Sequence, residues 1–332
     1  MKLSGLVRSC LPIGFVIVTA ALAPPVVAQV TWTASTGTGV MYGLAKELVY
    51  NTYNGASYIE SELDWDIKPL VYAQASLTMG TKIGFVASLD ARVGVPAKTG
   101  QIGDSDWLNV AYNGDTTKTN YSQSDCYTER AIVLDSRFGW DLHVAEWVTL
   151  EPFLAFGLMD FNWTARDGYL QYPPGWFGGS ASQPYPDSST DLKVPISGVG
   201  IIYQQTYFIP AAGLAAKFRL GKALSGTLSF AFSPLVFCND VDNHELAGKD
   251  FYDAMLGGVL LEPKVSLDWQ ILRRARLSLD VSYRHIAGLI GTTTTVLTGV
   301  GHTPGQVSGT YVNGAGASFD ALDASLNLVW TL

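Results

Sequence analysis

The last eleven residues of the chain alternate between apolar and mostly polar side chains. Every second residue from Leu322 to Leu332 is apolar, and Asp323, Ser325, Asn327 and Thr331 stand between them. Successive side chains of a β-strand point to opposite faces, so this segment predicts a strand with one apolar and one polar face. Such a strand fits the core of a soluble sandwich, but also a membrane barrel, where lipid and lumen are the two environments.

The same alternation recurs along the chain. We count ten segments, at residues 38–50, 58–77, 82–95, 127–138, 147–163, 196–220, 226–237, 252–269, 275–289 and 315–332. Short connections alternate with mostly longer ones rich in Gly, Ser, Thr, Asn and Asp, as in bacterial outer-membrane barrels. The sequence therefore predicts an all-β fold, a ten-stranded antiparallel transmembrane β-barrel with both termini on the short-turn, periplasmic side and long extracellular loops.

Composition agrees with this class and excludes others. Only 15% of the residues are charged and 48% are hydrophobic, which is typical neither of a disordered chain nor of an average soluble domain. The net charge is −8, and an acidic chain lacks the basic surface that phosphate contacts require. We therefore expect no nucleic-acid partner.

The N-terminus resembles an export signal. Lys2 and Arg8 precede the apolar residues 11–22, and Val26-Val27-Ala28 supplies small residues for cleavage after Ala28. We expect residues 1–28 to be a signal peptide and residues 29–332 to form the barrel in the outer membrane. Cys126 and Cys238 would then remain in an oxidising compartment, and the sequence leaves open whether they pair.

Two acidic motifs lie in the predicted second and fourth long loops. Asp104 and Asp106 are two residues apart, so on an extended segment both carboxylates point to one face and can share a proton or a water molecule. Asp242 and His244 have the same spacing, and a carboxylate beside an imidazole can orient it as a general base. Taken singly, the first motif also fits a solvated turn or a pair of calcium ligands, and the second fits an ordinary polar loop.

In a ten-stranded barrel the second and fourth outer loops face each other across the mouth. The two motifs would then leave a gap for an extended peptide and a water molecule. We find no serine-nucleophile elbow, zinc-binding spacing or phosphate-binding loop, so we expect neither a metal nor a cofactor.

The sequence resembles the omptin family of outer-membrane endopeptidases in several motifs. Asp104-Ser105-Asp106-Trp107 matches the family's Asp-x-Asp-Trp, and Asp240, Asp242 and His244 match its Asp-x-Asp-x-His. Residues 61–65 resemble its Ser-Gln-Leu-Asp-Trp segment, and residues 163–166 and 203–214 resemble two further segments in the same order. The resemblance covers essentially the whole mature chain.

The resemblance implies an aspartic-type endopeptidase that hydrolyses extracellular polypeptides at basic residues. Asp104 and Asp106 would be the catalytic aspartate couple, and Asp242 with His244 the dyad that activates water. Glu47 lies in a segment that matches the family's Lys-Glu-x-Val-Tyr, and with Asp240 it resembles the acidic pocket for a basic side chain. From the residues alone, an ion-paired residue that faces the lumen is the favoured interpretation of Glu47.

The chain also departs from the family. Residues 119–125 do not reproduce the family's Trp-Thr-Asp-x-Ser-x-His-Pro signature, and Asp160 and Thr206 stand where the family has the arginines that bind lipopolysaccharide phosphate. We therefore expect outer-membrane lipid around the barrel but no lipopolysaccharide binding through the family site. The alternative function is a non-catalytic barrel, an adhesin or narrow channel on the same scaffold.

Overall fold

The computed structural model describes residues 30–175, 184–299, 303 and 305–332, so the expected signal peptide lies outside the described residues. The described chain is almost entirely β-structure. Its strands are β1 (Val30–Tyr53), β2 (Ala56–Thr81), β3 (Phe85–Gly94), β4 (Ala97–Asp106), β5 (Asn120–Trp140), β6 (Leu142–Ala145), β7 (Val148–Gln171), β8 (Val194–Arg219), β9 (Leu224–His244), β10 (Lys249–Leu272), β11 (Ala275–Leu297) and β12 (Gln306–Thr331). The two helices are α1 (Asn109–Asn113) and the 3-10 turn η1 (Ser188–Thr190), and no described helix has the length and apolarity needed to cross a membrane.

The strands close into an antiparallel ring. β1 pairs with both β2 and β12, and β5 pairs with β7. β3 and β4 follow each other between β2 and β5 and share one place in the ring, while β6 is a short hairpin partner of β7. The ring therefore has ten places, as the sequence predicts.

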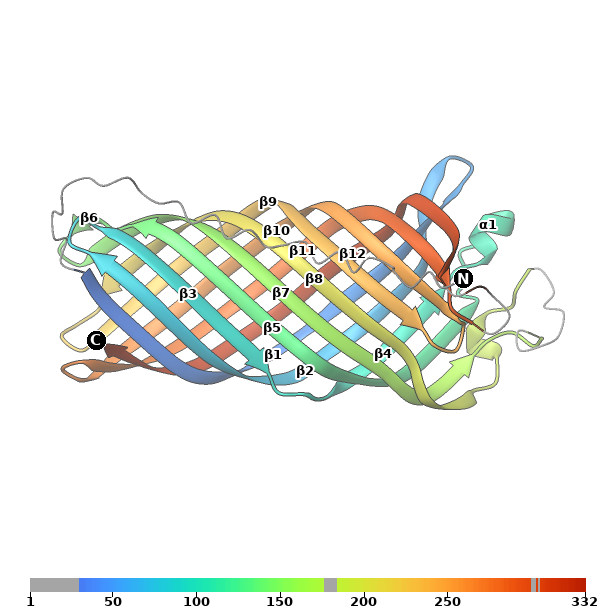
Figure 1. Cartoon of the computed structure of the whole chain (residues 1–332), viewed down its shortest axis with the longest axis horizontal. Coiled ribbons are helices and arrows are strands. Elements are labelled where there is room, and N and C mark those ends of the chain that lie inside the picture. The colour runs from blue at the N-terminus through green and yellow to red at the C-terminus, as the bar shows by residue number, and fades with distance from the viewer. Residues whose placement is uncertain (1–29, 176–183, 300–302, 304) are drawn as a thin grey trace, which may run out of the picture.

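The even number of places brings the two ends of the ring together. The Leu332 amide donates to the Trp32 carbonyl at 2.9 Å, beside the short turns. Figure 1 shows β6 and the C-terminus at one end of an elongated molecule and α1 at the other. The connection 107–119 and the described residues 172–175 and 184–193 of the next long connection lie at the α1 end, so long and short connections occupy opposite ends as expected.

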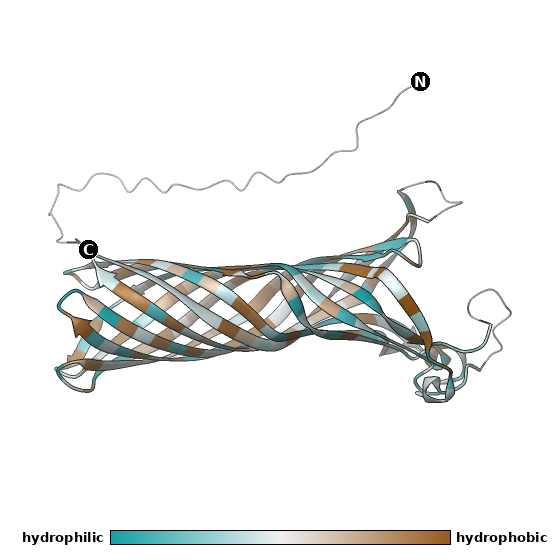
Figure 2. Cartoon of the chain, turned by 90° about the horizontal axis from the view of Figure 1, so that it is seen from below, coloured by the Kyte–Doolittle hydropathy of each residue, from teal (hydrophilic) through white to brown (hydrophobic). Residues whose placement is uncertain are grey.

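The two faces of the sheet are the reverse of those in a soluble protein. In β12, Asp323, Ser325 and Asn327 are buried in the lumen, whereas Leu322 and Leu326 on the outer face are 52% and 54% exposed. Figure 2 shows polar and apolar residues following one another along the strands. The predicted orientation of this strand is therefore confirmed.

The strands are longer than the sequence predicts. Residues 96–126, 238–251 and 290–314, expected as long loops, are largely the strands β4, β5, β9, β10, β11 and β12. The expectation failed because these strand ends carry polar residues on both faces, so they lack the apolar alternation that marks a strand. Ladder hydrogen bonds between neighbouring chains define them instead.

A layer of aromatic side chains crosses the lumen. Its six members are completely buried: Trp65, Phe161, Trp163, Tyr203, Tyr207 and Phe319. Their rings are linked by contacts such as Phe161 to Phe319, at 5.3 Å between centroids, and Trp65 to Tyr203, at 5.1 Å. The lumen is thus filled at this level by side chains of β2, β7, β8 and β12.

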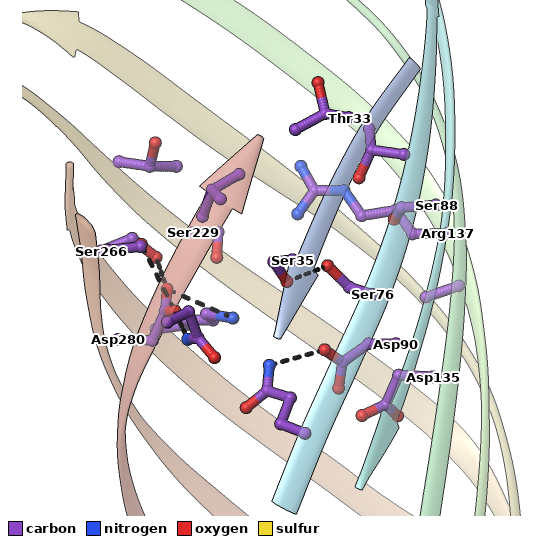
Figure 3. Close-up of a pocket in the computed structure, with 18 of the residues that line it drawn as sticks. Thr33, Ser35, Ser76, Ser88, Asp90, Asp135, Arg137, Ser229, Ser266 and Asp280 are labelled. Atoms are coloured by element: carbon purple, nitrogen blue, oxygen red, sulfur yellow. Dashed lines mark hydrogen bonds and ion pairs between the residues drawn. The ribbon is translucent and has the colours of Figure 1, made fainter. Parts of the chain in front are cut away.

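On the short-turn side of this layer lies a polar cavity of about 330 Å³. Figure 3 shows Asp90, Asp135 and Asp280 among the side chains around it, with Ser35 bonded to Ser76. Cys126 and Cys238 are buried elsewhere in the ring, and both are free thiols. The sequence left open whether the two cysteines pair, and in the structure they do not.

Candidate active site

The two acidic motifs lie on strands rather than in loops. Asp104 and Asp106 are among the last residues of β4, and Asp242 and His244 end β9. The prediction of loop positions is therefore wrong, for the reason given above. The two-residue spacing still has its expected effect: Asp104 and Asp242 point into the lumen and are 8% and 1% exposed.

Serine hydroxyls hold the aspartate couple. Ser61 of β2 and Ser122 of β5 each donate to a different carboxylate oxygen of Asp104 at 3.4 Å. Burial raises the pKa of Asp104, and burial together with the charge of Asp104 raises the pKa of Asp106 well above its usual range. Asp106 is therefore the member of the couple that most readily holds a proton.

The dyad on β9 is an ion pair. Asp242 contacts the His244 Nε2 atom, and the ring of Phe251 on β10 packs edge-on against the imidazole at 5.3 Å. Burial lowers the pKa of His244, but the charges of Asp242, Asp104 and Asp106 outweigh burial and raise the pKa to about 9. The side chain of His244 remains 26% exposed, so it is accessible from the mouth of the barrel.

The couple and the dyad face the same space. The His244 imidazole and the Asp242 carboxylate both act on the pKa of Asp104, and both members of the couple act on His244. β4 and β9 are far apart in the sequence and are not neighbours in the ring. The structure thus brings the two predicted pairs together across the lumen.

A pocket of carboxyl groups lies beside the dyad. Glu47 of β1 and Asp240 of β9 are 2% and 3% exposed, and the Tyr203 hydroxyl donates to Asp240 at 2.9 Å. Gln205 in turn donates to the Tyr203 oxygen at 2.7 Å and to the Lys46 carbonyl at 3.0 Å. Burial and the neighbouring carboxylates, Asp242 first, raise the pKa of Glu47 well above its usual range.

Sequence reasoning missed several residues of this region. Phe251 and Asp253 of β10 face the lumen opposite Asp242 and Asp240, and Tyr203 and Gln205 support the pocket from β8. The hairpin register would have found Asp253, because the four-residue turn between β9 and β10 places it directly across from Asp240. Among the described residues, no group of His, Cys, Asp and Glu side chains forms a possible metal site.

Comparisons with known proteins agree with the architecture. Among solved structures, the chain is similar to the outer membrane protease OmpT of Escherichia coli, with a TM-score of 0.79 and 18% identity over 91% of this chain and 97% of that chain. The toluene transporter TodX of Pseudomonas putida also aligns, at 10% identity over 93% of this chain and 91% of that chain, but its TM-score of 0.31 carries no argument about the fold.

No protein with a curated description matches the chain. The family model described as "Omptin family" matches residues 28–332, which is nearly the whole sequence. The match spans the ring of strands, the aspartate couple and the Asp–His pair described above. The chain therefore belongs to the Omptin family.

Proposed function

We propose that the chain is an outer-membrane endopeptidase that cleaves polypeptides at basic residues. One observation carries the proposal: an aspartate couple on β4 and an Asp–His pair on β9 interact electrostatically across the mouth of the barrel. They lie at the end with the long connections, on the opposite side of the aromatic layer from the short turns. Family membership and the OmpT-like fold support the same class.

The outer surface supports a place in the membrane. Large apolar side chains such as Leu154, Phe156, Leu322 and Leu326 are exposed on the outer face of the strands, where water would be an unfavourable solvent. The polar residues of the same strands point inward. This arrangement suits a barrel whose middle is surrounded by lipid and whose α1 end projects beyond it.

In the proposed reaction a water molecule lies between Asp104 and His244. His244 takes a proton from the water as its oxygen attacks the peptide carbonyl carbon, and Asp242 orients the imidazole and stabilises its charge. Asp106 donates its proton in a hydrogen bond to the developing oxyanion. When the carbon–nitrogen bond breaks, His244 returns its proton to the leaving amine, so the products are a carboxylic acid and an amine.

Glu47 and Asp240 form the proposed site for the basic side chain on the amino side of the cut. Buried carboxylates bind a guanidinium or ammonium group through charge-assisted hydrogen bonds, which are stronger than neutral ones. Arrival of the cation would favour ionisation of Glu47, whose raised pKa results from burial and from like charges.

The alternative as a channel has less support. The six aromatic side chains that cross the lumen have 0% exposure, so the described lumen offers no continuous aqueous path at their level. An adhesin without catalytic activity would also not require His244 to lie among the carboxylates of Asp104, Asp106 and Asp242. Both observations favour the enzyme.

Cleavage of a peptide with an Arg-Arg pair by the refolded protein tests the proposal. We expect His244→Ala and Asp104→Ala each to reduce kcat/KM by at least about a hundredfold, as for loss of a general base. His285→Ala is the matched control, because His285 also pairs with a carboxylate, Asp320 at 2.6 Å, but on the outer face. Retention of the heat-resistant mobility of folded barrels on gels shows that a variant is folded, and wild-type rates in folded His244→Ala would refute the assignment.

A further inference from the structure

The pocket beside the dyad contains a third carboxylate, Asp253. It lies in β10 directly opposite Asp240 of β9, points into the lumen and is 8% exposed. Asp240 and the Thr293 hydroxyl of β11 both act on the pKa of Asp253, which burial raises to about 6. Its Oδ1 atom has no hydrogen-bond partner, and the same is true of Glu47 Oε2 and Asp240 Oδ1.

Other acids of the lumen have a cation as partner. On the short-turn side of the aromatic layer, Arg284 binds Asp135 at 3.1 Å and Glu262 at 2.9 Å. Within the described residues, no lysine or arginine forms an ion pair with Glu47, Asp240 or Asp253. Lys46, next to Glu47 in the sequence, points outward and pairs with Glu62 at 2.7 Å and Asp64 at 3.0 Å.

Buried carboxylates without a cation are unfavourable unless a ligand supplies one. Asp240 and Asp253 lie side by side on the neighbouring strands β9 and β10, and Glu47 approaches them from β1, which is not their neighbour in the ring. A guanidinium offers five N–H donors in a rigid plane, whereas an ammonium offers three from a single atom. Three carboxylates can therefore engage more donors of an arginine than of a lysine.

We propose that Asp253 is a specificity-determining residue that, with Glu47 and Asp240, makes the pocket select arginine over lysine on the amino side of the cut. This inference rests on the proposed endopeptidase function. It differs from the two-carboxylate pocket that the sequence predicted, because the third group discriminates between two basic side chains instead of only attracting positive charge.

The test uses two peptides that differ only in arginine or lysine before the cut. We expect the wild type to have the higher kcat/KM for arginine, and Asp253→Asn to reduce that value by at least about tenfold, the loss of one charge-assisted hydrogen bond. The lysine peptide should lose less, so the ratio of the two values should fall. Asp250→Asn is the matched control, because it makes the same change three residues away on the opposite face of β10 and should leave the ratio unchanged.

The outcomes separate this inference from the proposed function. The ratio of kcat/KM for the arginine peptide to that for the lysine peptide could be the same in the wild type and in folded Asp253→Asn. That result would overturn the role of Asp253 but would not contradict the endopeptidase function. A wild type that cleaves neither peptide would refute the endopeptidase itself. If Asp253→Asn does not refold, inhibition of the wild type decides: methylguanidinium should inhibit more strongly than methylammonium, and equal inhibition would overturn the inference.

Discussion

At the scale of single residues, the protonation of His244 determines when the proposed base can act. Carboxylates raise its pKa to about 9, so the imidazole is protonated and inactive as a base below that pH. We therefore expect kcat/KM to rise with pH, to reach half its maximum near the pKa of His244 and to level off above that pH. Asp242→Asn removes the charge that raises the His244 pKa most, so it should lower the rate and move the midpoint of the rise to lower pH. A pH profile whose midpoint does not move in this variant would contradict the prediction.

The carboxylate of Glu47 gives a second prediction at this scale. Glu47→Gln keeps the shape of the side chain but removes one charge-assisted hydrogen bond, which is worth about 1.5–3 kcal/mol. Cleavage of peptides with Arg or Lys before the cut should fall by the corresponding factor, while any cleavage of neutral peptides should change little. The comparison of kcat/KM for basic and neutral peptides checks this, and equal rates for both with the wild type would show that the pocket is wrongly assigned.

At the scale of strands, ion pairs in the lumen join both neighbouring strands and strands that lie apart in the ring. Arg284 of β11 is 8% exposed and binds Asp135 of β5 and Glu262 of β10. Arg284→Met should destabilise the barrel by about 3 kcal/mol, because partly buried Glu262 loses its cation and Asp135 keeps only Arg92, at 3.6 Å.

The control for Arg284 is Arg130→Met. Arg130 pairs with Asp160 on the outer face and is 45% exposed, so its loss should cost about 1 kcal/mol or less. Unfolding in urea from lipid vesicles, followed by tryptophan fluorescence, measures both changes. Equal destabilisation by the two variants would show that the lumenal network does not hold the strands together.

At the scale of the whole molecule, the outer face bears on the lipid requirement. Asp160 accepts hydrogen bonds from Gln204 at 2.7 Å and Thr206 at 3.0 Å, and it pairs with Arg130. If the position corresponds to the family's arginine, as the sequence resemblance implies, this cluster offers a carboxylate in its place, and a carboxylate repels phosphate. We expect the protein refolded in detergent to cleave peptides at the same rate with and without lipopolysaccharide. Activity that requires the lipid would contradict this expectation.

The sequence by itself determined the features that depend on local periodicity. Ten strands, their inward and outward faces and the shared end for both termini follow from alternation of residue types, because a strand directs successive side chains to opposite sides. The two-residue spacing likewise placed both members of each acidic motif on one face. These features need no knowledge of which strand lies beside which.

Only the tertiary structure decided the rest. Alternation cannot locate strand segments that are polar on both faces, so β4 was predicted to be loop and β9 was predicted to stop before the residues of the site. The approach of Asp104 to His244 and the third carboxylate, Asp253, depend on ring closure and on strand register. Free Cys126 and Cys238 follow from the same closure. Each of these is a relation between distant segments, and long-range backbone pairing, which leaves no local pattern in the sequence, determines all of them.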